Sequence, residues 1–204
     1  MVSQRRNTAE VIGSPRAANA IPERAILDAA YELLLAVGMR RMTMADIARQ
    51  ADVSRATLYR RWPNVQAVIA ALMTREFGQL AASVVSAQGL DGRATLVAGV
   101  VHAVAEVREH PLLRKIVDVD PEFLLPYLVQ RRGSTADFQL SLLEQGIRRG
   151  IADGSVRDGD PKLLARAVLL SAWSFVITGP LLVSKRQYQA LDNELAELLD
   201  RYLA

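Results

Sequence analysis

The chain has 204 residues, half of them hydrophobic and only 5% aromatic, and it contains no cysteine. That length allows one or two small domains with a core, and the lack of cysteine excludes disulfides, zinc sites with cysteine ligands and thiol redox switches. The net charge is only +3, but residues 1–65 carry ten arginines against six acidic residues. Positive charge therefore gathers at one end, which is typical of a face that binds phosphates.

The first segment, residues 1–20, is a polar arm that contains Arg5, Arg6 and Arg16. Such an arm is either a disordered tail or a strand of chain that reaches DNA phosphates or the minor groove. It lacks the continuous apolar core of a secretory signal, so we expect a cytoplasmic protein.

Helical patterns follow along the rest of the chain, and period-two alternation is rare, so the sequence predicts an all-α fold. Pro22 opens the first helix, and Gly38 is a plausible stop for it. Its apolar stripe consists of Ile26, Ala29, Ala30, Leu33, Leu34 and Val37. Further helices are expected at about 43–50, 54–61, 64–84, 93–109, 112–118, 135–152, 161–178 and 187–203, with Pro126 dividing a helix that starts at Asp120-Pro121.

Residues 43–62 form the most informative segment, a helix-turn-helix. Thr43, paired with Asp46 in a variant of the capping box, begins the first of the two helices. Ser54 begins the second. Asp52 stands in the turn where glycine is common, and aspartate tolerates the positive φ that this turn requires. A capped helix rich in arginine, threonine and tyrosine fits the major groove of DNA.

Contacts with DNA can be assigned along this segment. Arg55 and Thr57 lie near the start of the second helix, where base edges are read: arginine binds guanine and the threonine methyl touches thymine. Tyr59, Thr43 and Ser54 are expected at phosphates, which fix the register but not the sequence. Additional charge would come from Arg40, Arg41, Arg60 and Arg61. For each arginine, a solvated surface charge is the alternative.

Residues of this segment and its neighbours make the chain resemble the tetracycline-repressor family of bacterial regulators. The residues that carry the resemblance lie within 22–73 and are Gly38, Thr43, Ile47-Ala48, Val53-Ser54, Thr57-Leu58-Tyr59 and Trp62. Two positions depart from the family pattern. Trp62 replaces the usual phenylalanine, and Val65 stands where a lysine often meets phosphate.

The resemblance implies an N-terminal three-helix DNA-binding domain at 21–81, with the helix-turn-helix motif at 44–63, and a C-terminal helical bundle at 82–204. It implies a homodimer that pairs 161–178 and 187–203 of each subunit. It also implies a small-molecule effector, apolar or amphipathic, that releases DNA. Candidate pocket residues are Phe77, His102, Glu106, Phe123, Tyr127, Phe138 and Trp173, and the alternative for each aromatic is ordinary core.

A single helix-turn-helix reads too few bases to find one genomic site, so a two-fold dimer on a palindromic operator is expected. The main reading is a repressor, with an activator as the alternative. No phosphate loop, HExxH motif or nucleophile elbow supports an enzyme, and no cofactor is expected. His102 and Glu106 lack a third ligand for a metal. Residues 167–183 are uncharged, but Gly179-Pro180 interrupts them, which favours a buried helix over a membrane span.

Overall fold

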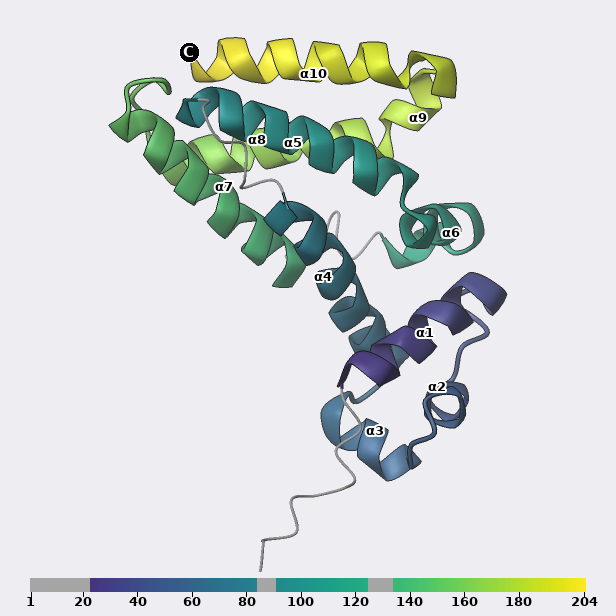
Figure 1. Cartoon of the computed structure of the whole chain (residues 1–204). Coiled ribbons are helices and arrows are strands. Elements are labelled where there is room, and N and C mark those ends of the chain that lie inside the picture. The colour runs from purple at the N-terminus through teal and green to yellow at the C-terminus, as the bar shows by residue number, and fades with distance from the viewer. Residues whose placement is uncertain (1–22, 84–90, 125–133) are drawn as a thin grey trace, which may run out of the picture.

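The computed structural model describes residues 23–83, 91–124 and 134–204, and every regular element within these ranges is a helix (Figure 1). The α-helices are α1 (Glu23–Val37), α2 (Met44–Gln50), α3 (Arg55–Arg61), α4 (Val65–Ser83), α5 (Gly92–Glu109), α6 (Pro111–Val119), α7 (Ser134–Ala152), α8 (Pro161–Ile177), α9 (Gly179–Leu182) and α10 (Tyr188–Leu203), and two short 3₁₀ turns are η2 (Pro121–Phe123) and η4 (Lys185–Gln187). The predicted arm at 1–20 and the division at Pro126 lie outside the described residues.

The helix ends form as the sequence predicts. Gly38 follows α1 with φ +77°, a left-handed conformation that glycine adopts without strain. The side chain of Asn64 accepts the amide N–H of Ala67 at 2.9 Å and so caps α4. Asp160 likewise accepts the N–H of Lys162 at 3.0 Å, with Pro161 in the first turn of α8.

The first helix buries a slightly different face from the predicted one. Leu27, absent from the predicted stripe, is 3% exposed, whereas Val37 is 40% exposed. Val37 is the last residue of α1, directly before the Gly38 turn, so no following helical turn covers it.

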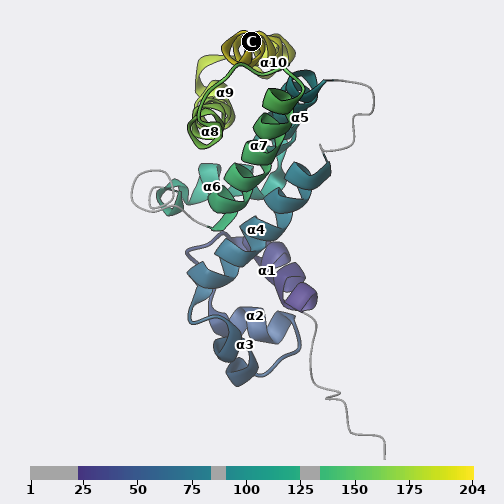
Figure 2. The ribbon, with the colours of Figure 1, turned by 90° about the vertical axis from the view of Figure 1, so that its left-hand side faces the viewer.

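Two hydrophobic clusters lie at opposite ends of an elongated molecule (Figure 2). The first joins α1–α4 and also takes in Leu112, Leu113 and Ile116 of α6. The second lies among α5, α7, α8 and α10. Val176 of α8 packs against both clusters, and α4 extends from the α1–α3 end toward the other helices. The helix-turn-helix is therefore mounted on a core that the distal part of the chain helps to fill.

The C-terminal helices leave a broad apolar face uncovered. The large exposed hydrophobic side chains on α8, α9 and α10 are Leu163, Leu170, Leu181, Leu182, Leu198 and Tyr202. Residues 167–183 are divided between α8 and α9 rather than forming one helix. In the described part of the chain, no helix combines the length and the apolarity that crossing a membrane requires.

Candidate nucleic-acid interface

The helix α3 lies at the end of the molecule opposite to α10 (Figure 1). Leu58 anchors it, because this side chain is fully buried in the cluster that contains Ile47 and Ala48 of α2. Arg55, Tyr59 and Arg60 are exposed, and Tyr59 keeps 53% of its surface. Burying a large tyrosine ring would normally be favourable. Its exposure next to two arginines makes this face of α3 a candidate for binding another molecule.

The start of α2 is fixed by a reciprocal cap. Thr43 Oγ1 accepts the N–H of Asp46 at 3.1 Å, and Asp46 Oδ2 accepts the N–H of Thr43 at 3.2 Å. The hydroxyl of Thr43 also donates to Asp46, and Arg49 donates to the same carboxylate at 2.7 Å. These two side-chain hydrogen bonds, Thr43 first, lower the pKa of Asp46. The predicted capping box is confirmed, and the Thr43 hydroxyl proton is already used within it.

The turn between the two helices adopts the strained conformation that the sequence predicts. Asp52 has φ +52°, and the following Val53 N–H donates back to the carbonyl of Ala48 at 2.9 Å. Ser54 Oγ then accepts the N–H of Thr57 at 3.1 Å and lies 2.8 Å from Thr57 Oγ1. The Thr57 hydroxyl is therefore held against the cap. Because the hydroxyl is fixed, the side-chain rotamer is fixed too, and so is the direction in which the Thr57 methyl points.

Arg61 and Trp62 close the end of α3. Trp62 is 7% exposed and fills the space that the sequence assigns to an aromatic plug. The Arg61 guanidinium lies 5.7 Å from the centre of the Trp62 ring, and its Nη1 lies 3.8 Å from Glu23 of α1. Arg61 is thus turned toward the protein's own first helix, while Arg60 points to solvent.

Arg40 is paired with acidic side chains of its own chain, whereas the sequence predicts a charge that contacts DNA. Its Nε donates to Glu122 at 2.6 Å and lies 3.6 Å from Asp120, so acidic side chains after α6 already neutralise it. A hydrogen bond from Glu122's own backbone and the one from Arg40 lower the pKa of Glu122. Arg40 would have to leave these carboxylates to bind a phosphate, so its role at DNA stays a prediction. Arg41 is exposed, and within the described ranges it pairs with no acidic residue.

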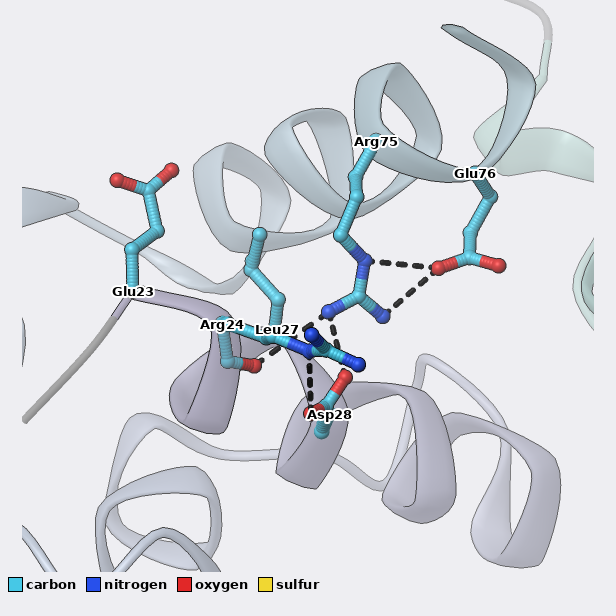
Figure 3. Close-up of a pocket in the computed structure, with 6 residues that line it drawn as sticks. All are labelled: Glu23, Arg24, Leu27, Asp28, Arg75 and Glu76. Atoms are coloured by element: carbon cyan, nitrogen blue, oxygen red, sulfur yellow. Dashed lines mark hydrogen bonds and ion pairs between the residues drawn. The ribbon is translucent and has the colours of Figure 1, made fainter. Parts of the chain in front are cut away.

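A shallow cavity of about 400 Å³ lies between α1 and α4, on the flank of the helix-turn-helix (Figure 3). Arg75 spans it by donating to Asp28 at 2.6 Å and to Glu76 at 2.8 Å. None of the residues that line it is a predicted pocket residue: they are Glu23, Arg24, Leu27, Asp28, Arg75 and Glu76. The ion pair between Arg75 and Asp28 joins the start of α1 to the middle of α4, whereas Glu76 is the neighbour of Arg75 on α4 itself.

His110 is a half-buried titratable side chain that the sequence analysis does not single out. It lies between α5 and α6, where its Nδ1 accepts the N–H of Leu112 at 3.3 Å and its Nε2 lies 3.6 Å from Glu76. The rings of Tyr31 and Phe77 meet it edge to face. Burial lowers the pKa of His110, and Glu76 and Glu106 partly oppose this shift. The signal in the sequence was its position directly before Pro111, at a junction between two helices.

The described pocket candidates differ in their surroundings. Phe77 is buried in the first cluster, and Phe123 packs against that cluster. The Trp173 indole N–H donates to Gln139 Oε1 of α7 at 3.4 Å, whereas Phe138 is 39% exposed. Tyr127 lies outside the described residues.

His102 and Glu106 are both exposed on α5. They share a face at spacing i, i+4 as expected, but that face meets solvent because the opposite face of α5 carries the buried Val97, Val100 and Val104. In this chain, His102 and Glu106 therefore face solvent rather than a buried pocket.

Comparison with known proteins identifies the arrangement. A family model described as bacterial regulatory proteins, tetR family, matches residues 26–72. A helix-turn-helix-type transcriptional regulator of Mycobacterium bovis is 33% identical over 180 residues, which cover 87% of this chain and 92% of that protein.

Two solved structures share the fold. The transcriptional repressor QsdR of R. erythropolis, from the TetR family, has a TM-score of 0.67 at 19% identity and covers 87% of this chain and 93% of its own. The regulator FadR of Bacillus subtilis, solved in complex with stearoyl-CoA, has a TM-score of 0.63 at 20% identity and covers 87% of this chain and 97% of its own.

Proposed function

Since this chain belongs to the tetR family of bacterial regulatory proteins, we propose that it is a transcriptional repressor that binds a palindromic operator as a homodimer and is released by a small molecule. The observation that carries the proposal is the outer face of α3. There Arg55, Tyr59 and Arg60 are exposed on a helix that Leu58 anchors from below. The chain would act by binding alone, without catalysis or a cofactor, in the cytoplasm where the operator lies.

Each exposed side chain has a proposed part in this contact. Arg55 reads guanine in the major groove, and the Thr57 methyl, held by Ser54, touches a thymine methyl. Tyr59, Arg60 and Arg41 meet phosphates, which fix the register of α3 along the groove. The Thr43 hydroxyl proton is already donated to Asp46, and a phosphate oxygen can only accept hydrogen bonds, so the proposed phosphate contacts at these two caps come from nearby main-chain N–H groups.

The uncovered leucines of α8, α9 and α10 support the homodimer. Leu170 is 73% exposed, and Leu181 and Leu182 are more than 80% exposed. Several large apolar side chains exposed on neighbouring helices favour an interface. Two copies that join this face would place two α3 helices on the same side of the dimer, as a palindrome requires. Mass measurement in solution should give about 45 kDa, twice the 22.4 kDa of one chain.

The effector is proposed to be apolar or amphipathic. The stearoyl-CoA bound to the similar FadR of Bacillus subtilis supports this chemistry. In this chain, the half-buried Phe123 and Trp173, with Phe138 and Phe77 on neighbouring helices, remain the proposed aromatic contacts. Ligand binding among these aromatic side chains would release DNA by changing the distance between the two α3 helices.

The test is footprinting of the purified protein on the DNA upstream of its own gene and of the adjacent gene. We expect protection of two half-sites about one helical turn apart, related by two-fold symmetry. Protection that overlaps the promoter supports repression, and protection upstream of it indicates activation. Protection without two-fold symmetry, or binding that ignores sequence, would contradict the proposal.

A further inference from the structure

A buried ion pair joins the last turn of α5 to the first turns of α10. Arg108 donates from Nη1 and Nη2 to the two carboxylate oxygens of Asp192, at 2.9 and 2.7 Å. The side chains are 2% and 8% exposed, and the guanidinium stacks 4.3 Å from the centre of the Tyr188 ring. The third guanidinium nitrogen, Arg108 Nε, is buried and has no hydrogen-bond partner among the described residues. A fully desolvated pair with one unmet donor is costly, so its presence calls for a role besides stability.

The spacing of leucines on the buried face of α10 suggests what that role is. Leucine recurs every fourth residue on this face, at Leu191, Leu195, Leu199 and Leu203. The last three are at most 1% exposed. If α10 slid by four residues along α5, leucine would replace leucine at most of these positions. Hydrophobic burial alone therefore distinguishes poorly between the observed register and a register shifted by one turn.

We infer that the Arg108–Asp192 pair fixes the register of α10 on α5, and that it thereby sets the distance between the two recognition helices of the dimer. In a register shifted one way, Ala196 takes the place of Asp192, and shifted the other way, Tyr188 does. Neither side chain is a carboxylate, so either shift leaves a buried guanidinium unpaired. Buried polar groups that act in this way select one alignment at some cost in stability.

The other contacts between the ends of α10 and the rest of the chain favour one register of α10 less strongly. Arg93 Nε lies 3.0 Å from Asp200, but this pair is 26% and 48% exposed, and water competes with it. Arg157 donates to the main-chain oxygens of Leu203 and Tyr202, at 2.8 and 2.9 Å. Main-chain oxygens are the same at every residue, so these two bonds carry no sequence information. The Arg157 guanidinium also lies 4.9 Å from the centre of the Tyr202 ring, but that ring is exposed, so the contact is weaker than a buried ion pair.

The experiment measures the register within one chain. The chain has no cysteine, so cysteines introduced at the exposed Ala98 of α5 and Gln189 of α10 take nitroxide labels at those two sites alone. Labelled protein is mixed with excess unlabelled protein, so that distances between subunits do not contribute. The otherwise unaltered chain should give one narrow distance distribution. With Arg108→Met and Asp192→Leu together, we expect a folded helical protein whose distribution gains a second component, displaced by about 6 Å, one turn of four residues.

Two further variants keep the result decisive. Arg93→Gln with Asp200→Asn removes the exposed pair of the same two helices and should leave the distribution unchanged. If the apolar pair of substitutions fails to fold, Arg108→Gln with Asp192→Asn keeps size and polarity, and it should broaden the distribution, because an unmet amide costs less than an unmet charge. A single distribution of unaltered width in whichever buried-pair variant folds would overturn the inference. So would a change confined to the Arg93 variant.

The second part of the inference rests on the proposed function and is measured separately. A buried-pair variant that still has the mass of a dimer should bind DNA with two half-sites at least about tenfold more weakly, while binding to one half-site is unchanged. Unchanged affinity for both DNAs, together with a displaced distance component, would remove the link to half-site spacing and leave the register. If the unaltered protein binds no operator, the proposed function fails, and the distance measurement still decides the register.

Discussion

Six arginines toward the N-terminal end of the described chain form two groups that differ in their neighbours. Arg40, Arg49 and Arg75 each lie within 2.7 Å of a carboxylate oxygen. Arg41, Arg55 and Arg60 are exposed, and nowhere in the described chain do they pair with an acidic side chain. Only the second group is available to bind a polyanion such as DNA. The positive charge that can bind phosphates at this end is therefore smaller than the number of arginines in the sequence suggests.

Arg55 is predicted to contribute to operator affinity by contacting a DNA base. Arg55→Ala should weaken operator binding by about 1–3 kcal/mol, because it removes a bidentate contact to guanine. Anisotropy titration with the footprinted operator measures this loss. Arg201→Ala, an exposed arginine on α10 at the other end of the molecule, serves as the control and should bind normally. Equal affinity of the two variants would contradict the role of Arg55.

Arg40 and Arg60 should differ in how salt affects binding. Arg60→Ala should reduce the slope of log affinity against log salt by about 1, because one phosphate contact and its released counterion are lost. Arg40→Ala should leave that slope unchanged, because Glu122 and Asp120 already neutralise Arg40. Titrations at several salt concentrations decide the point, and a reduced slope for Arg40→Ala would return Arg40 to the DNA interface.

His110 should make stability fall in mild acid. Its folded pKa lies below the ordinary value of 6.5, chiefly because burial disfavours the charged imidazolium. As the pH drops through about 6.5, the unfolded chain takes up a proton before the folded chain does, so the free energy of unfolding decreases until the folded pKa is passed.

The measurement is urea unfolding at about pH 7.5 and about pH 5.5. His110→Gln should lose less stability between these two values than the unaltered protein. His102→Gln, which alters the other of the two histidines and one that is exposed, should behave like the unaltered protein. Equal losses in all three proteins would show that His110 does not carry the effect.

At the scale of elements, α6 and the turn between α1 and α2 are fastened together. Asp120, at the end of α6, is 2% exposed and accepts the N–H of Met39 at 2.6 Å. A Cβ on Gly38 would lie 2.8 Å from the same carboxylate, so only glycine allows this close approach. The distal part of the chain thus contacts the helix-turn-helix through α6 as well as through the continuous α4.

Asp120→Ala should cost about 1–3 kcal/mol of stability, because it leaves the buried Met39 N–H without an acceptor. Glu122→Ala is the matched control. It removes an acidic neighbour of the same arginine at a more exposed position, so its loss should be smaller. Urea unfolding of both variants measures the difference, and a loss for Glu122→Ala as large as that for Asp120→Ala would refute this ranking.

The sequence predicted elements best where one side chain satisfies a particular main-chain group. The caps at Thr43 and Ser54 and the positive φ at Asp52 are confirmed, because each depends on residues within three or four positions. The short α9 and η4 were not predicted. They lie in a connection between two long helices, where no periodic stripe indicates a helix.

At the scale of the whole molecule, the recognition helix and the uncovered leucines lie at opposite ends (Figure 1). In the proposed dimer, any change in how two copies meet would be carried over the length of the chain before it reaches α3. Small rotations where the two copies meet would become larger displacements at DNA, which is why the alignment of α10 on α5 would matter for half-site spacing.

Leu170→Glu should separate the dimer. Leu170 is 73% exposed in the single chain, so the substitution should not disturb folding, but it would bury a charge between two copies. Mass measurement should fall from about 45 kDa to about 22 kDa, with loss of binding to the two-half-site operator. Val119→Glu, at an exposed apolar residue of α6, is the control and should stay dimeric. A Leu170→Glu protein that keeps the larger mass would contradict this interface.

By itself, the sequence determined the helix-turn-helix, its caps and its strained turn, because hydrogen bonds and dihedral preferences of neighbouring residues fix these features. Only the tertiary structure decided which charges are free. Arg40 meets Glu122 and Arg108 meets Asp192 across more than eighty residues, and no local pattern predicts such partners. It also turned His102 and Glu106 to solvent, because helical spacing places two residues on one face, whereas only packing decides what that face meets.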